Sequence, residues 1–261
     1  MFLENHKPPL IIDEIQYATE LLPYIKMKVD QARLEALKSD VPSTCLYYLT
    51  GTQMFTMMKN VSESLAGRVG IIDMYGLSYS KIIGKDQDYF LPTSKRCKER
   101  EQYPRPETLE VFEKIIRGSF PALYQNENIS TERFYNGYLR TYLERDIGNL
   151  IIIKEETKFL TFMSAVAART GQELNYDNLA RDAEIDNKTA KSWFSYLQTS
   201  GLIFLLQPYS NNPATRAIKT PKMYFTDTGL ACYLARYSDA KTLEKSAING
   251  NIFETVELFV W

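Results

Sequence analysis

The first 75 residues alternate regularly between short apolar runs and segments with helical periodicity, and this pattern limits the folds that the chain can adopt. Apolar runs at 9–12, 45–49 and 69–75 predict strands, and the segments 20–38 and 54–66 between them predict helices. This order predicts a parallel sheet covered by helices. Ligands of such sheets bind beyond the carboxyl ends of the strands. The polar residues at the ends of the first two strands are Asp13, Glu14, Thr50, Thr52 and Gln53.

The first predicted strand ends at two adjacent acids, Asp13 and Glu14. This is the Walker B arrangement, in which the first acid helps to hold the magnesium ion that bridges nucleotide phosphates. The second acid orients and polarises the attacking water. Acids also follow strands for other reasons, so this motif alone leaves both interpretations open.

Two further motifs follow in order. Thr52 and Gln53 come after the second predicted strand, where a polar side chain would lie beside the γ-phosphate; the alternative is a turn with a helix N-cap. Arg68 precedes the third predicted strand and is a candidate arginine finger for a neighbouring subunit's nucleotide. The alternative for Arg68 is an ordinary surface arginine.

The sequence from 158 onward predicts a winged helix-turn-helix, because helices are followed by a hairpin of two strands. The predicted helices are 158–169, 176–183 and 188–200, and the predicted strands are 202–206 and 222–226. Asp186 offers an N-cap for the third helix.

A DNA-binding role would place the helix 188–200 in a major groove. The basic residues that would contact DNA are Lys188 and Lys191 on that helix, with Arg216, Lys219 and Lys222 on the hairpin. The acids Asp177, Asp182, Glu184 and Asp186 surround them, so the charge is mixed. Winged helices also serve as structural or protein-contact units, which is the alternative interpretation.

Several longer stretches are similar to a known family. PPLIIDEIQ, LTGTQMF and SESLAGRVG resemble the second half of the core of predicted prokaryotic AAA-type ATPases. The stretches TYLERDI, LNYDNLARDAEIDNKTAKSW, KTPKMYFTDTGLACYL and GNIFET resemble the region that follows this core, named domain of unknown function 4143. The fold class implied is α/β, with a partial P-loop NTPase-type parallel sheet, then helices and a winged helix-turn-helix.

The resemblance also implies roles for residues of the site. Asp13 would be the magnesium-side acid, Glu14 the water-activating acid, Gln53 with Thr52 the sensor, and Arg68 the candidate finger. ATP and Mg²⁺ would be the cofactors of the parent protein, which would act as a homo-oligomer. A DNA or protein partner would bind through the winged helix, and no membrane partner is expected.

The chain departs from the family at the phosphate-binding loop. That loop needs GxxxxGK[ST], and the Gly-Lys pair at Gly84 and Lys85 is followed by Asp86. The loop is therefore expected upstream of Met1, and the chain is expected to be a fragment. We predict that it binds no ATP or Mg²⁺ and hydrolyses no ATP by itself.

Four regions are expected along the chain: a partial ATPase core at 1–83, a connecting helical region at 84–157, a winged-helix part at 158–235, and the start of a restriction-endonuclease-like portion at 236–261. The resemblance to that last portion breaks off after Glu254, so no nuclease chemistry is assigned.

Composition narrows the classes of function. The 32 acidic and 31 basic residues nearly cancel, so the whole-chain charge indicates no nucleic-acid partner. Cys45, Cys97 and Cys232 are far apart and His6 is the single histidine, which argues against a zinc site and fits a reducing cytoplasm. No apolar run approaches the roughly 18 residues of a transmembrane helix, and the N-terminus lacks the pattern of a signal peptide.

Overall fold

The computed structural model describes residues 2–39, 45–51, 61, 64–84, 93–95, 98, 106–142, 156–209, 211 and 219–259. The chain divides into two compact units, Met1–Asp73 and Met74–Trp261, and each has its own hydrophobic core.

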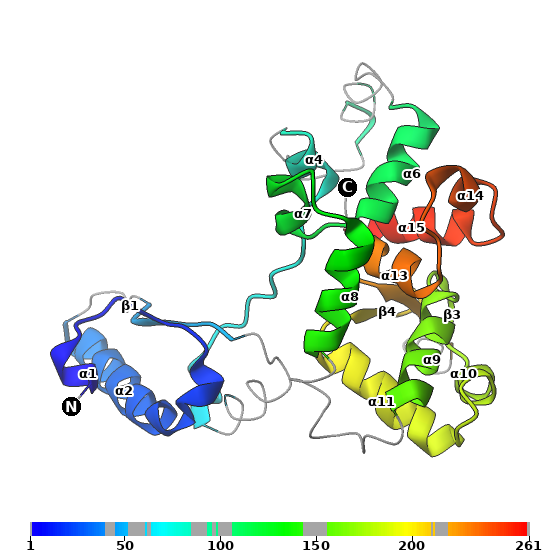
Figure 1. Cartoon of the computed structure of the whole chain (residues 1–261). Helices are drawn as coiled ribbons and strands as arrows, with labels where there is room; N and C mark the ends of the chain where they lie inside the picture. The colour runs from blue at the N-terminus through cyan, green and yellow to red at the C-terminus, as the bar shows by residue number, and fades with distance from the viewer. Residues whose placement is uncertain are drawn as a thin grey trace. The chain divides into compact units, whose positions relative to one another are not determined.

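The first unit contains a two-stranded parallel sheet, as predicted (Figure 1). Strand β1 (Leu10–Ile12) pairs with β2 (Tyr47–Leu49) in the register Leu10 to Tyr47. The long helix α2 (Leu22–Ser39) connects them and confirms the helix predicted at 20–38. The shorter elements are α1 (Phe2–Asn5), η1 (Ile15–Tyr17) and η2 (Thr19–Leu21).

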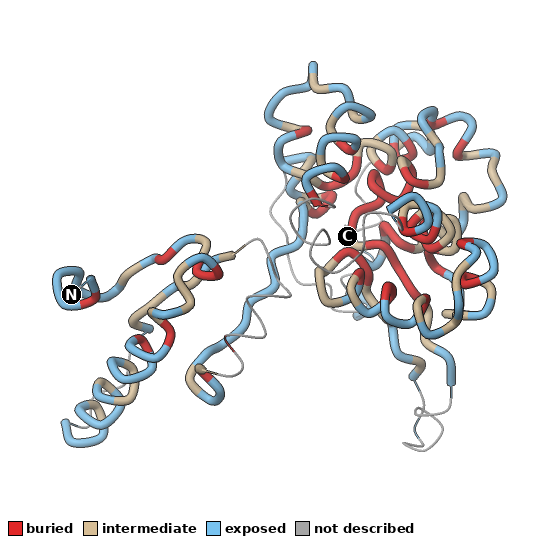
Figure 2. The backbone as a smooth tube through the Cα atoms, turned by 60° about the horizontal axis from the view of Figure 1, so that its bottom comes forward, coloured by how far each residue is buried: buried red, intermediate tan, exposed pale blue. Residues whose placement is uncertain are grey.

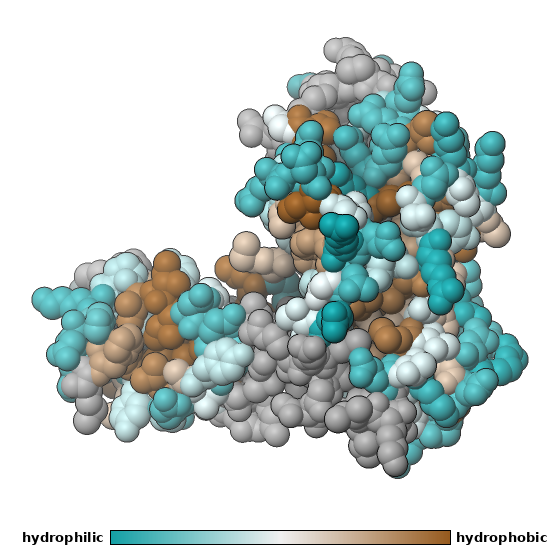
Figure 3. All heavy atoms as spheres, in the orientation of Figure 1, coloured by the Kyte–Doolittle hydropathy of each residue, from teal (hydrophilic) through white to brown (hydrophobic). Residues whose placement is uncertain are grey.

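The core of the first unit lies on one face of this sheet. Ile12 of β1 packs with Ile15, Leu22 and Ile25, because alternate side chains of a strand point to opposite faces. On the other face Ile11 and Tyr48, which are partners in the register, are 70% and 53% exposed, and hydrophobic residues are visible at the surface of this unit (Figure 3).

The prediction of a third strand at 69–75 is wrong. These residues form neither helix nor strand, and Ile72 and Met74 are 87% and 93% exposed. An apolar run becomes a strand only where a neighbouring strand supplies hydrogen bonds, and within the described residues β1 and β2 pair with each other alone. The helix predicted at 54–66 lies mostly outside the described residues.

In its described residues the second unit is mainly helical, with one small antiparallel sheet (Figure 1). Its helices are α4 (Tyr79–Ile82), α6 (Thr108–Arg117), α7 (Pro121–Gln125), α8 (Thr131–Tyr142), α9 (Glu156–Ala167), α10 (Tyr176–Asp182), α11 (Asn187–Thr199), α13 (Thr228–Leu234), α14 (Ala240–Glu244) and α15 (Asn249–Phe259). Its strands are β3 (Gln172–Glu173), β4 (Ile203–Leu206) and β5 (Lys222–Phe225), in the order β3-β5-β4.

The helices and the hairpin predicted between 158 and 226 are present. Asp186 caps α11, because its carboxylate accepts a hydrogen bond of 2.9 Å from the backbone of Thr189. The helix ends before Gly201, whose φ of 75° lies in the left-handed region that favours glycine. The strand β3 was not predicted, because two residues carry no periodic signal.

One core unites the second unit, and Figure 2 shows how its buried residues follow the inner sides of the elements. The segments before 157, from 158 to 235 and after 236 all contribute to it, through residues such as Tyr135, Phe159 and Ile252, which are 0% exposed. Trp193 of α11 stacks edge-on against Phe159 and Phe162 of α9.

Candidate functional site

The carboxyl ends of β1 and β2 meet at one edge of the sheet and bring Asp13 beside Thr50. The backbone N–H of Thr50 donates to the carbonyl of Ile12, and the N–H of Ile15 donates to the carbonyl of Thr50, both at 3.0 Å. The Thr50 hydroxyl donates to the Asp13 carboxylate. Parallel pairing therefore places an exposed carboxylate and a hydroxyl together at the end where ligands of such sheets bind.

Glu14 occupies a special backbone position directly after Asp13. Its φ of 52° lies in the left-handed region, which is uncommon for a residue other than glycine. The side-chain amide of Gln16 donates to the Glu14 carboxylate. Gln16 is only 9% exposed, and its Oε1 is buried without a hydrogen-bond partner among the described residues. Such unsatisfied buried atoms are rare and call for an explanation.

Thr52 and Gln53, the predicted sensor residues, lie outside the described residues, so their position beside Asp13 stays a prediction. Arg68 is described and is engaged within its own unit. Its guanidinium forms a two-pronged ion pair with Asp30 of α2, at 2.6 and 3.0 Å. This hydrogen bonding lowers the pKa of the Asp30 carboxyl. Arg33 of the same helix donates to the carbonyl of Gly67 at 3.1 Å.

Some of the basic residues predicted to contact DNA are exposed, and others are paired or lie outside the described residues. Lys188 and Lys191 are exposed on α11, and the Lys191 ammonium lies 5.7 Å from the ring centre of Tyr176. Lys219 is exposed, and Arg216 lies outside the described residues. Lys222 is held by Glu254 of α15 in an ion pair of 2.7 Å.

Sequence reasoning missed a buried polar cluster around Asp227. The Asp227 carboxylate, in a residue 6% exposed, accepts four hydrogen bonds of 2.7 Å. The donors are the N–H and hydroxyl of Ser119, the hydroxyl of Tyr135 and the N–H of Leu230. Burial, together with the nearby Asp227 charge, raises the pKa of Tyr135. The signal that would have indicated this cluster is an acid at an N-cap position within the apolar stretch MYFTDTGLACYL.

Two glycines make the Asp227 cluster possible. A Cβ atom at Gly118 would lie 2.0 Å from the Tyr135 hydroxyl, and a Cβ at Gly229 would lie 2.2 Å from it. The cluster joins the residues after α6 to α8 and to the start of α13, so its role is to fix these three elements relative to one another.

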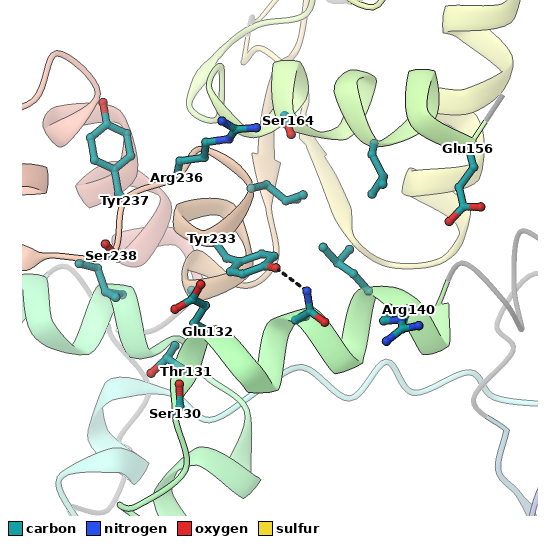
Figure 4. A pocket seen from close by; sticks show the side chains of 16 residues that line it. Ser130, Thr131, Glu132, Arg140, Glu156, Ser164, Tyr233, Arg236, Tyr237 and Ser238 are labelled. Carbon is teal, nitrogen blue, oxygen red and sulfur yellow. Dashed lines mark hydrogen bonds between the residues drawn. The ribbon is translucent and has the colours of Figure 1, made fainter.

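A second feature that the sequence did not indicate is a cavity of about 750 Å³ beside this cluster (Figure 4). Residues of α8, α9 and α13 line it, together with the residues that follow α13. Helix periodicity shows which side of a helix is apolar, but it does not show where three helices leave a space between them.

Within the described residues, no group of three or more His, Cys, Asp or Glu side chains is placed to hold a metal ion. No helix of this part of the chain has the length and apolar character needed to cross a membrane.

Two models of known protein families match parts of the chain. The family model of an AAA domain matches residues 1–83, which include Asp13, Glu14 and Arg68, so this part of the chain is related to AAA-type ATPases. A second family model, a domain of unknown function numbered 8612, matches residues 108–241. This match covers more than half of the chain, and the chain belongs to that family. The expected domain of unknown function 4143 is not confirmed.

The chain is similar to two curated proteins whose names state no function. Uncharacterized proteins of Mycobacterium bovis and Mycobacterium tuberculosis are each 24% identical to the chain over 246 residues. The alignment covers 94% of this chain and 48% of each relative, so the chain spans about half the length of these relatives. No solved structure matches the chain.

Proposed function

We propose that the chain supplies the acidic half of the nucleotide site of an AAA-type ATPase. The observation that carries this proposal is the placement of Asp13 and Thr50 at the shared carboxyl edge of two parallel strands, inside the segment that matches an AAA domain. The whole protein would hydrolyse ATP to drive a process that the chain itself does not identify.

The residues present fit Mg²⁺ and ATP in chemical type. Mg²⁺ prefers oxygen ligands, and Asp13 and Thr50 offer a carboxylate and a hydroxyl at an exposed edge. Bound Mg²⁺ would neutralise charge on the phosphates. Asp13 would hold the ion, and Glu14 would orient the attacking water. The unpartnered Oε1 of Gln16, next to Glu14, is an acceptor for a donor that arrives with the completed site.

The sensor and finger roles complete this proposal. Thr52 and Gln53 follow β2 in the sequence and would contact the γ-phosphate side of the site. Arg68 would act on the nucleotide of a neighbouring subunit in a homo-oligomer. Because Asp30 holds the Arg68 guanidinium, this role requires exchange of Asp30 for phosphate.

The test supplies the phosphate-binding loop from another AAA domain. We expect the chain alone to show no magnesium-dependent ATP turnover, and a fusion that places the phosphate-loop half of an AAA domain before Met1 to gain it. Glu14→Gln should abolish that turnover and Asp13→Asn should weaken the Mg²⁺ dependence. The exposed acid Glu20 provides the control, Glu20→Gln, with turnover unchanged. Turnover by the fusion that survives both Asp13→Asn and Glu14→Gln would contradict the assignment.

A second function, binding of duplex DNA, is favoured by the order of elements from α9 to β5. The order helix, strand, two helices and two strands, with the sheet order β3-β5-β4, supports the proposal that this region is a winged helix-turn-helix. The exposed Lys188 and Lys191 lie on α11, the helix that would enter the major groove.

Electrophoretic mobility of a DNA duplex tests this second function. We expect a shift that weakens as salt rises, because phosphate contacts release counterions. Lys191→Glu should reduce the shift, whereas Lys241→Glu, at an exposed position of α14, should not. Absence of a shift at low salt would reject DNA and leave a protein-contact role for this region.

A further inference from the structure

The cavity beside the Asp227 cluster has the size of a ligand site and belongs to neither proposed function. Its volume of about 750 Å³ lies within the range of small-molecule pockets. Helices α8 and α9 form two sides, and α13 with its following residues forms a third (Figure 4). The cavity therefore lies wholly within the second unit.

Part of the lining is apolar and suits a hydrocarbon group. Leu139 of α8, Leu160 of α9 and Leu234 of α13 contribute to it from three different helices. A ligand side chain placed among them would be stabilised because its apolar surface is removed from water.

Charged groups of both signs border the same cavity. The exposed side chains of Glu132, Arg140, Glu156 and Arg236 make no hydrogen bond or ion pair with any described residue. Some charged groups elsewhere in this unit are paired, as Arg169 is with Asp182, and others, such as Lys188, are exposed. A ligand that matches this lining carries both a negative and a positive group.

Arg236 adds a second observation that indicates a site. Its φ of 63° is left-handed, at a position after a helix end where glycine is the usual residue. An arginine in this conformation carries a backbone strain that glycine would avoid. Figure 4 shows its side chain extended toward Ser164 of α9, over the cavity. Close by, Asn136 donates a hydrogen bond of 3.2 Å to the Tyr233 hydroxyl and so fixes the orientation of this aromatic ring.

We propose that this cavity binds a small zwitterion with an apolar side group, namely an apolar amino acid or a short apolar peptide. Its carboxylate would accept hydrogen bonds from Arg236 and Ser164. Its hydrocarbon group would lie among the three leucines, and its ammonium group would face Glu132 or Glu156. The cavity is lined by the region that matches the domain of unknown function and not by the ATPase-like unit.

Calorimetric titration of the chain tests the ligand chemistry with four probes. L-leucine and L-leucyl-L-leucine carry both charges, isocaproate carries only the negative charge, and isoamylamine only the positive one. We expect at least one of the two zwitterions to bind about tenfold or more tightly than either singly charged probe. Binding of leucine would indicate an amino acid as ligand, and binding of the dipeptide alone would indicate a peptide. No binding of either zwitterion, or equal binding of isocaproate, would overturn the proposal.

A glycine substitution tests the role of Arg236 without threatening the fold. Arg236→Gly removes the guanidinium and also relieves the left-handed strain, so the variant should remain folded. We expect it to weaken binding of the zwitterion by about tenfold or more. Arg133→Gln, at an exposed position on α8 that does not line the cavity, is the control and should bind normally. Unchanged affinity in Arg236→Gly would overturn the assignment of the carboxylate.

Discussion

At the scale of single residues, Asp227 illustrates how a buried carboxylate is accommodated. Burying a charge is costly unless it is fully hydrogen bonded. Its four donors come from Ser119, Tyr135 and Leu230, which belong to three separate parts of the second unit. The same carboxylate also caps the N-terminus of α13. One side chain therefore holds these elements together.

Removing the Asp227 carboxylate should destabilise the protein strongly. Asp227→Ala leaves buried donors without an acceptor, and we expect a loss of about 3 kcal/mol in the free energy of unfolding. Asp239→Ala is the matched control, because Asp239 caps α14 at an exposed site through a 2.8 Å bond from Thr242 and should cost about 1 kcal/mol. Urea denaturation measures both values, and equal losses would contradict the special role of Asp227.

At the scale of elements, α2 depends on polar contacts more than its length indicates. It has 18 residues, yet only Leu22 and Ile25 near its start are buried. Further along, Asp30 and Arg33 attach the helix to Arg68 and Gly67. These contacts fix the helix that follows the candidate Walker B acids, so Arg68 has a structural role besides its candidate role as a finger.

The ion pair of α2 predicts an effect of acid. Because the pKa of Asp30 is lowered in the folded state, the pair stabilises the fold above the unfolded value near 3.8, and this contribution is lost as the pH falls through the folded value. We expect Arg68→Ala to lower the melting temperature of the first unit more at pH 6 than at pH 3. High salt should shrink the difference, because the pair is partly exposed. An equal effect at both pH values would contradict the prediction.

At the scale of the whole molecule, the second unit buries several tyrosines around one core. Burial raises the pKa of Tyr124 to about 12, although the nearby Arg117 lowers it in part. Burial also raises the pKa of Tyr135, and the Asp227 charge raises it further. The Tyr124 hydroxyl donates to the carbonyl of Gly118 at 2.8 Å, and the Tyr135 hydroxyl donates to the Asp227 carboxylate. Both hydrogen bonds need the phenol proton, so they favour the neutral form of each tyrosine.

Because the pKa values of these tyrosines are raised in the folded state, we expect alkali to destabilise the second unit. A folded pKa above the unfolded value of about 10 gives stability that is complete below pH 10 and falls as the pH rises toward the folded value. We expect each such tyrosine to remove up to about 1.4 kcal/mol per pH unit between pH 10 and 11.5, measured by urea denaturation. Tyr124→Phe should reduce this slope, and Tyr209→Phe, at a residue 82% exposed, should not. A slope unaffected by Tyr124→Phe would contradict the prediction.

Residue types at single positions were sufficient to predict where some helices and strands begin and end. Asp186 and Gly201 mark the ends of α11, because capping and left-handed backbone depend on the residue at that position. The apolar run Leu10–Ile12 followed by Asp13 determined a strand with an acid at its carboxyl end. The same kind of reasoning failed for 69–75, because pairing needs a neighbouring strand and a local pattern does not supply one.

Contacts between groups far apart in the sequence could not be predicted in this way and depend on how the chain folds in three dimensions. Arg68 and Asp30 are 38 residues apart, and Tyr135 and Asp227 are 92 apart, yet each pair is in direct contact. The cavity bordered by Arg236 likewise exists only after three helices have packed. The physical reason is that hydrogen bonds and packing act over a few ångströms in space, whatever the separation along the chain.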